Sequence, residues 1–206
     1  MIRTLTAIAV ILAIAGCATS PKPRFYTLSP QPAVAAAPIG TAASDRPRIL
    51  VGPVMLPDAV NRPQLVTRVG ANEVAIEEQH RWAGPLKDEV PRILAADLER
   101  LTRNPRLSAD PFAAASAADY RLTVDFQRFE GVVGDDVTLD ALWTVLRTNG
   151  DVVSTGRSVL REPAGAPGYD ALTAAYSRAL SKLADSIAPA LNALPVIKHG
   201  TAGLPP

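Results

Sequence analysis

The chain has 206 residues, with 21 Lys or Arg against 20 Asp or Glu and a formal net charge of +1. A nearly balanced charge creates no long-range field for nucleic acid or an anionic membrane surface, so we expect neither a nucleic-acid partner nor a phosphate-binding site. The 19 prolines and a hydrophobic fraction of 48% predict long unstructured connections around one modest core.

Residues 1–16 have the pattern of an export signal. Arg3 supplies the positive end, residues 5–14 form a short apolar core, and small residues follow. This core is too short to cross a bilayer, because a spanning helix needs ~20 apolar residues.

The signal ends in Ile14-Ala15-Gly16-Cys17, which matches a bacterial lipobox, and Cys17 is the only cysteine of the chain. One interpretation is a chance cysteine behind a signal peptide. A lone thiol cannot form an internal disulfide, however, so the sequence favours lipid attachment at Cys17.

The resemblance to lipoprotein signals implies cleavage before Cys17, a diacylglyceryl thioether on its sulfur and acylation of the new amino group. Several acyl chains hold a protein at a bilayer where a single chain would not. Ala18, rather than aspartate, follows the cysteine, so we expect the periplasmic face of the outer membrane. These lipids are the only added groups expected, and no other cofactor or metal is predicted.

After an acylated tether over residues 17–23, the sequence predicts one domain over residues 24–194 and a disordered tail over residues 195–206. The domain opens on a short strand at residues 24–28. Residues 29–47 are rich in Pro and Ala, and we expect a flexible segment there because nothing in it offsets the ordering entropy.

A strand at residues 49–54 is expected to be buried on both faces and to end at its proline. A hairpin follows, with arms at residues 64–69 and 73–77 around a Gly-Ala-Asn turn. Alternation in the second arm places Val74 and Ile76 inward.

An amphipathic helix is predicted from Leu86 to Leu101. Because Pro91 lacks a backbone donor, the helix either kinks there or begins near that residue. Residues 107–118 are then expected to form a polar, Ala-rich connection.

The central stretch carries the motifs LPDAVNRPQLVTR (residues 56–68), NEV (72–74), HRW (80–82) and PL (85–86). These motifs closely resemble the ABC-type transport auxiliary lipoprotein family, which includes PqiC-like lipoproteins. The wider resemblance covers roughly residues 24–191, mostly as pattern rather than identity.

Three more strands are predicted, over residues 119–130, 137–147 and 152–161. A bulge near Gln127 or Arg128 would bring Phe129 to the inner face, and another bulge is possible at Gly156. Both faces of the strand over residues 137–147 are partly apolar, so we expect it to be central or to pack against a partner.

A long amphipathic helix starting at Tyr169 and ending at Pro189 and Pro195 completes the domain. Two helices following two groups of strands predict an α+β, two-layer domain. Both amphipathic helices would cover one face of a mixed, mostly antiparallel sheet.

Motifs for catalysis are missing from the sequence. His80 and His199 are the only histidines, and the chain has no Gly-x-Ser-x-Gly elbow, Walker loop or zinc-ligand set. We interpret His80 as a structural residue at the hairpin closure; a periplasmic enzyme that uses His80 is the alternative.

The polar residues of the central motif either fix its loop to the same domain or contact a neighbouring subunit. Trp82 is interpreted as a core residue at the helix entry. Our candidates for partner binding and self-association are Asp58, Arg62, Gln64, Arg68, Glu73, His80, Arg81, Trp82, Leu142 and Leu146.

The family resemblance implies a non-catalytic accessory lipoprotein of MCE-type ABC systems, which move lipids or other hydrophobic molecules between the inner and outer membranes. It also implies homo-oligomeric rings that meet the periplasmic tunnel of the MCE-domain protein. A lipoprotein scaffold for outer-membrane assembly, unrelated to lipid traffic, is the alternative.

Overall fold

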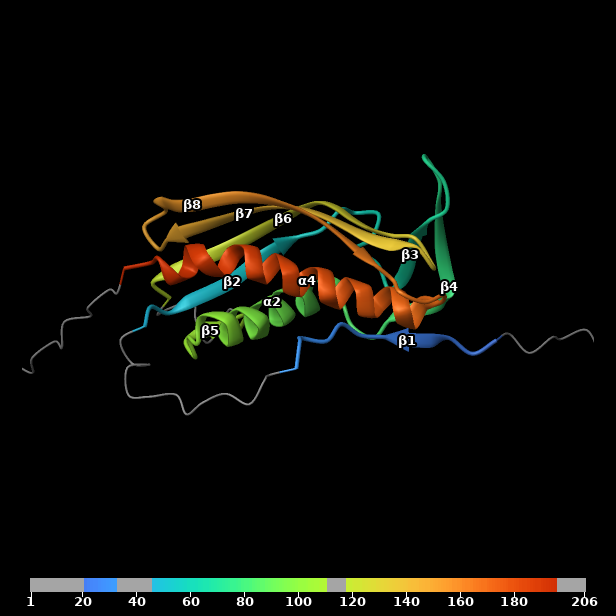
Figure 1. Ribbon diagram of the computed structural model, residues 1–206, viewed down its shortest axis with the longest axis horizontal. Coiled ribbons are helices and arrows are strands. Elements are labelled where there is room, and N and C mark those ends of the chain that lie inside the picture. Colours follow the sequence, from blue (N-terminus) through green and yellow to red (C-terminus); the bar gives the residue numbers. More distant parts are fainter. Residues whose placement is uncertain (1–20, 33–45, 111–117, 196–206) are drawn as a thin grey trace, which may run out of the picture.

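The computed structural model describes residues 21–32, 46–110 and 118–195. Two helices lie against one face of a five-stranded sheet, and a three-stranded sheet lies at one end of the molecule (Figure 1). The predicted α+β class is confirmed, but the strands form two sheets rather than one.

The strands and helices follow one another in the predicted order, with one short strand added. They are β1 (Arg24–Tyr26), β2 (Ile49–Met55), β3 (Gln64–Arg68), β4 (Val74–Trp82), α2 (Leu86–Thr102), β5 (Leu107–Ser108), β6 (Tyr120–Gly131), β7 (Asp136–Arg147), β8 (Val152–Pro163) and α4 (Tyr169–Asn192). The small sheet has the order β1-β4-β3 and the large sheet β5-β2-β6-β7-β8. The prediction of a connection without strands over residues 107–118 is partly wrong, because β5 lies within it.

The core lies between the large sheet and the two helices. The predicted inward rows of β6 and β7 are at most 8% exposed, and α2 and α4 contribute Leu94, Leu98, Leu180 and Leu183, which are fully buried. Each buried aliphatic side chain contributes roughly 1.5–3 kcal/mol. The central place of β7, between β6 and β8, is confirmed.

The predicted bulge in β6 is confirmed. The pairing with β7 shifts between Phe126 and Arg128. Phe126 and Phe129 are therefore both buried, with their rings in edge contact at 5.4 Å between centroids.

The structure differs from the predictions at Pro53 in β2 and at Pro189 in α4, and at Pro91 it selects the helix start at Leu86 over a start near Pro91. β2 continues through Pro53 to Met55, because its pairing with β6 shifts between Val51 and Val54 and the ladder needs no donor there. Helix α2 begins at Leu86 with Pro91 inside it, and α4 continues past Pro189 to Asn192. The buried faces of both helices compensate for the missing donors.

Residues 29–32, the start of the proline-rich segment, are bound to both helices. The Ser29 N–H donates to Ser177 Oγ on α4 at 3.1 Å, and the Gln31 N–H donates to Asp97 Oδ1 on α2 at 3.0 Å. Burial raises the pKa of Asp97. Residues 33–45 of the predicted flexible segment and most of the predicted tail lie outside the described residues, whereas residues 46–47 at the end of that segment are described.

Gly156 on β8 lies beneath the indole ring of Trp143. The pairing is regular here and shifts instead between Val145 and Leu146 of β7, so the bulge predicted at Gly156 is wrong. A Cβ atom at position 156 would lie 2.2 Å from Trp143 Cζ2. Only glycine leaves room for the ring, whose Nε1–H donates to Ser158 Oγ at 3.3 Å.

Gly156→Ala tests this close approach. The added methyl group forces Trp143 or β8 to move, and overpacking costs about 1–3 kcal/mol, so we expect a lower urea midpoint of unfolding. Gly70→Ala is the control, because a Cβ atom there comes no closer than 3.5 Å to the Glu73 side chain. Equal midpoints for the two variants would contradict the packing.

An ion pair joins the two sheets. Arg68 of β3 donates to Glu130 of β6 through Nη2 at 2.6 Å and Nε at 3.1 Å, and its Nη1 donates to the carbonyls of Gly70 and Ala71. Arg128 also donates to Glu130. Arg68 is thus fixed within its own domain.

This ion pair predicts a pH-dependent stability. Hydrogen bonding to Arg68 lowers the pKa of Glu130, so the pair stabilises the fold above the unfolded glutamate pKa of ~4.3 and loses that effect as the pH falls through the lower folded value. We expect Glu130→Gln to lose about 1 kcal/mol of unfolding free energy at pH 7 and to approach the parent protein below pH ~4. Denaturant titrations across pH measure this difference, with Glu99→Gln on α2 as the control for loss of a surface carboxylate. A difference that is independent of pH would refute the prediction.

Candidate interaction surfaces

The rings of two tyrosines and one histidine connect β1 and β4 to the start of α4. Tyr26 Oη and His80 Nδ1 are hydrogen-bonded at 2.8 Å, and His80 stacks on Tyr169 with centroids 3.7 Å apart and planes 18° from parallel. Burial, followed by a hydrogen bond to Glu77, raises the pKa of Tyr169 to about 12. His80 therefore links three elements, which supports the structural interpretation.

Trp82 belongs to the core, as predicted. It is 6% exposed, and its ring meets Tyr176 of α4 edge-on at 5.9 Å. Tyr176 in turn stacks on Phe129 at 4.6 Å, and burial raises the pKa of Tyr176. These contacts join β4 to α4 and leave Trp82 little surface for a ligand.

The other polar candidates lie around the hairpin. Gln64 donates to Glu78 at 3.3 Å, and Arg81 forms an ion pair with Glu78 at 3.1 Å. Three further candidates are exposed: Asp58 and Arg62 in the loop before β3, and Glu73 in the hairpin turn. The central motif is thus partly tied to its own domain, through Arg68 and Gln64, and partly open to contact.

The second arm of the hairpin is longer than predicted, and its two apolar residues face the other way. Val74 and Ile76 are 49% and 46% exposed, so their predicted inward direction is wrong. Leu65 and Thr67 of β3 face the core instead, at 1% and 2% exposure. Their partners on β4, Glu77 and Ala75, must share that face, which turns the alternate positions outward.

This reversal creates an exposed apolar face, here named the hairpin surface. Val66 pairs with Ile76 across the strands, and Val69 and Val133 border a small cleft of about 460 Å³ at the hairpin tip. Phe25 on β1 lies opposite Arg81, at the other edge of the small sheet. The hairpin surface consists of Phe25, Val66, Val69, Val74, Ile76 and Val133.

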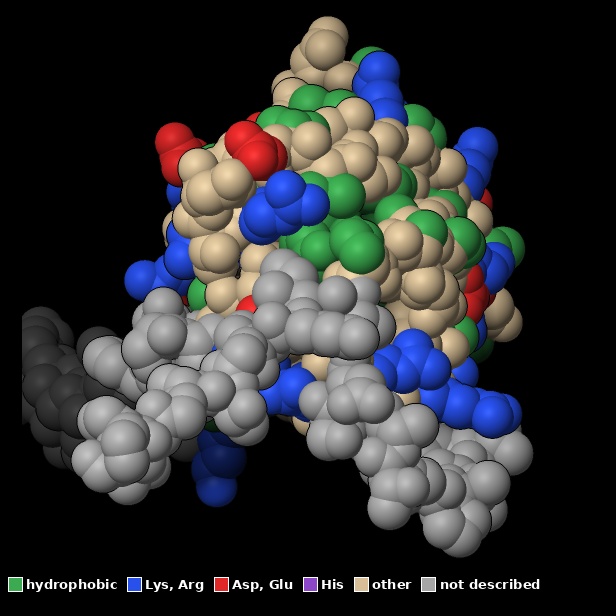
Figure 2. Space-filling view, turned by 90° about the vertical axis from the view of Figure 1, so that its left-hand side faces the viewer, with side chains coloured by type: hydrophobic (Ala, Val, Ile, Leu, Met, Phe, Trp, Pro, Cys, Tyr) green, Lys and Arg blue, Asp and Glu red, His purple; other side chains and the backbone are tan. Residues whose placement is uncertain are grey.

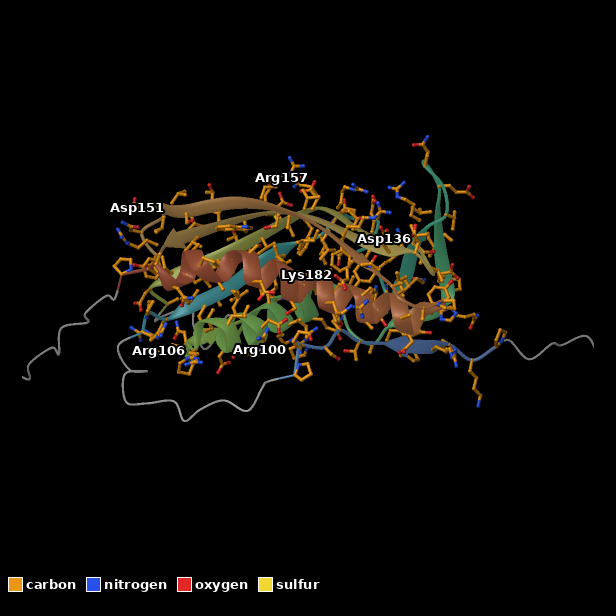
Figure 3. All side chains as sticks on the ribbon, in the orientation of Figure 1. Arg100, Arg106, Asp136, Asp151, Arg157 and Lys182 are labelled. Atoms are coloured by element: carbon orange, nitrogen blue, oxygen red, sulfur yellow. The ribbon has the colours of Figure 1, made fainter. Side chains whose placement is uncertain are left out.

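A second apolar face lies on the large sheet, on the side away from the helices. The sheet surface consists of Leu142 (42% exposed), Leu146, Val152 (61%) and Val159 (62%). The ion pair between Arg157 and Asp140, at 2.7 Å, crosses it. Arg157 projects away from the helices, whereas Lys182 lies on α4 (Figure 3). The sequence analysis identified Leu142 and Leu146 but missed Val152 and Val159.

A groove of about 1050 Å³ opens between α2 and the edge of the large sheet. Its apolar wall includes Leu50, Pro91 and Leu107, and charged side chains of α2 line its rim. From Asp110 at this rim the chain continues into residues 111–117, which lie outside the described residues.

Neither a metal site nor a helix that could span a membrane is found in the part of the chain that the structure describes. Within residues 21–32, 46–110 and 118–195, no three His, Cys, Asp or Glu side chains gather as a metal site would require. Neither α2 nor α4 is both long and apolar enough to cross a bilayer. Cys17, the predicted lipid attachment site, lies outside the described residues.

The fold is similar to solved structures at low sequence identity. A crystal structure described only as an uncharacterized protein has a TM-score of 0.67 and 18% identity, covering 82% of this chain and 98% of that one. Protein XCC0632 from Xanthomonas campestris, of family DUF330, has a TM-score of 0.59 and 20% identity, covering 83% and 93%. At these identities the similarity shows the fold alone.

A more distant structure, a PelC dodecamer from Paraburkholderia phytofirmans, has a TM-score of 0.40 and 14% identity, covering 71% of this chain and 90% of that one. This similarity is too low to support an argument about the present chain. A search of curated protein sequences gives no match.

The family model described as "ABC-type transport auxiliary lipoprotein component" matches residues 26–188. The match includes every strand of the large sheet, the hairpin and helix α2, and it extends into the last turns of α4. Because it spans far more than half of the 206 residues, the chain belongs to the ABC-type transport auxiliary lipoprotein family.

Proposed function

We propose that this protein is a lipid-anchored, non-catalytic auxiliary component of an MCE-type ABC system that moves lipids or other hydrophobic molecules between the inner and outer membranes. Its place would be the periplasmic face of the outer membrane, with Cys17 as the anchor. The observation that carries this proposal is the family match over residues 26–188. The lipobox at residues 14–17 supports the anchor.

The exposed surfaces support a role in binding rather than catalysis. His80, the residue that the alternative enzyme would use, has its Nδ1 hydrogen-bonded to Tyr26 and one ring face stacked on Tyr169. The sheet surface, by contrast, exposes large apolar side chains beside polar ones, as protein interfaces commonly do. In this proposal the protein works by positioning, while ATP is hydrolysed by another component of the system.

The sheet surface is the proposed site of self-association. Leu142 lies near its centre, with Asp125 of β6 on one side and Arg157 of β8 on the other. A second copy of the chain could cover this apolar centre, and Arg157 would keep its ion pair with Asp140 inside the contact. The exposed loop residues Asp58 and Arg62 remain candidates for contact with the MCE-domain protein.

Replacing Cys17 with Ser tests the anchor. We expect the parent protein to fractionate with outer membranes and to carry the mass of the acyl groups on residue 17, because several acyl chains hold a protein stably at a bilayer. Cys17→Ser should remain unprocessed or appear in the soluble periplasmic fraction. A mature parent protein without acyl mass would refute the anchor.

Leu142→Asp tests self-association. This exposed position tolerates a charge in the monomer, but a charge at the centre of an apolar interface is costly to bury, so we expect the assembly to dissociate. Native mass measurement of the detergent-solubilised, full-length protein reports the change, and co-purification reports the MCE-domain partner. Ala174→Asp, at an exposed position of α4, is the control. A parent protein that is monomeric and retains no MCE-domain partner would refute the docking model.

A further inference from the structure

We propose that the hairpin surface lies against the lipid bilayer that holds the anchor, so that the small sheet is the membrane-facing end of the domain. This inference rests on the lipid anchor of the proposed function and adds an orientation and a contact surface to it.

The hairpin surface is an apolar face without cover in the described part of the chain. Val74 and Ile76 are exposed on the outer side of β3 and β4, next to Val66, which is partly buried against the core. Phe25, at 63% exposure, extends the group to β1. The charged residues of this face are paired: Arg68, opposite Val74, with Glu130, and Glu78 with Arg81 beside β1.

The length of the tether limits how far this face can lie from the membrane. Six residues lie between Cys17 and Arg24, the first residue of β1, and the seven Cα-to-Cα steps of a fully extended chain span at most about 25 Å. Because β1 is an edge strand of the small sheet, the anchor pulls this sheet, rather than the large one, toward the bilayer.

The dimensions of α4 exclude the reversed orientation. Tyr169, the first residue of α4, lies beside Tyr26 with ring centroids 6.3 Å apart, so this end of α4 lies at the tether. The 24 residues of α4 extend about 36 Å from there. With the far end of α4 on the membrane, β1 would lie beyond the reach of the tether. Figure 1 shows β1, β3 and β4 gathered at one end of α4.

Ion pairs lie on both exposed apolar faces, so the reach of the tether, rather than charge, selects the hairpin surface. The sheet surface is crossed by the Asp140–Arg157 ion pair and bordered by the pair between Asp136 and Arg161, and contact with lipid would remove water from these charges. Basic and acidic side chains surround a small hydrophobic group at the end of the molecule opposite the hairpin (Figure 2). The hairpin surface carries ion pairs too, Arg68 with Glu130 and Glu78 with Arg81, beside its exposed Val, Ile and Phe side chains. A face of mixed apolar and charged side chains suits the boundary between headgroups and acyl chains.

Site-specific fluorescence in vesicles tests the contact. Cys17 is the only cysteine of the chain and is consumed by acylation in the proposed function, so Ile76→Cys adds a unique thiol to the full-length lipoprotein. The labelled protein is placed in vesicles of phosphatidylethanolamine and phosphatidylglycerol that contain spin-labelled lipid. Val159→Cys, on the sheet surface, is the matched control, and Val74→Cys is a second reporter from the hairpin.

We expect the labels at positions 76 and 74 to lose fluorescence to the spin-labelled lipid and the label at position 159 to keep it. Hairpin labels that respond to aqueous iodide but not to lipid would overturn the inference. Labels shielded from both quenchers would also overturn it, because a protein would then cover the face. If the parent protein lacks acyl mass and does not float with vesicles, the proposed anchor is wrong. If it is acylated and floats but the hairpin labels are not quenched by lipid, only the orientation is wrong.

Discussion

The placement of both helices on one side of the large sheet is the constraint on which the rest of the structure depends. The inward-facing side chains of β6 and β7 are almost completely buried beneath α2 and α4. Trp143 is part of this layer, and its ring fits only because Gly156 has no side chain. Among residues 21–32, 46–110 and 118–195, both helices lie on one side of the large sheet, and Leu142, Val152 and Val159 on its other side are exposed. A two-layer fold of this kind has a free sheet face for contact with other molecules.

The small sheet depends on a few specific links to this body. Arg68 joins it to Glu130 of the large sheet, while the Tyr26, His80 and Tyr169 rings join it to the first residue of α4. Strand β1 is therefore held by side chains of the domain as well as by its ladder with β4. A pull on the proposed anchor would be transmitted through these contacts to the body of the domain. Polar contacts of this kind allow the hairpin to project while its base stays fixed.

Much of the fold followed from local patterns. Alternation in residues 120–126 and 139–145 predicted the buried rows, and the parity break at Phe129 predicted a bulge that the structure contains. Proline effects were predicted less well, since tertiary packing compensates for a missing donor at Pro91 and Pro189. For the candidate surfaces, the sequence identified Leu142 but assigned Val74 and Ile76 to the core. The hydrophobicity of single residues does not indicate which face of a two-stranded hairpin is covered by the rest of the domain.

By itself, the sequence determined the α+β class, the order of most elements and the family, because periodic burial and a long ordered motif are local properties of the chain. Only the tertiary structure decided which residues face outward. Leu65 and Thr67 are buried on the inner side of the hairpin, and strand pairing therefore places Val74 and Ile76 on the outer side. It also brought Tyr26, His80 and Tyr169 together from distant parts of the chain. Such choices depend on contacts between distant residues, which no local pattern contains.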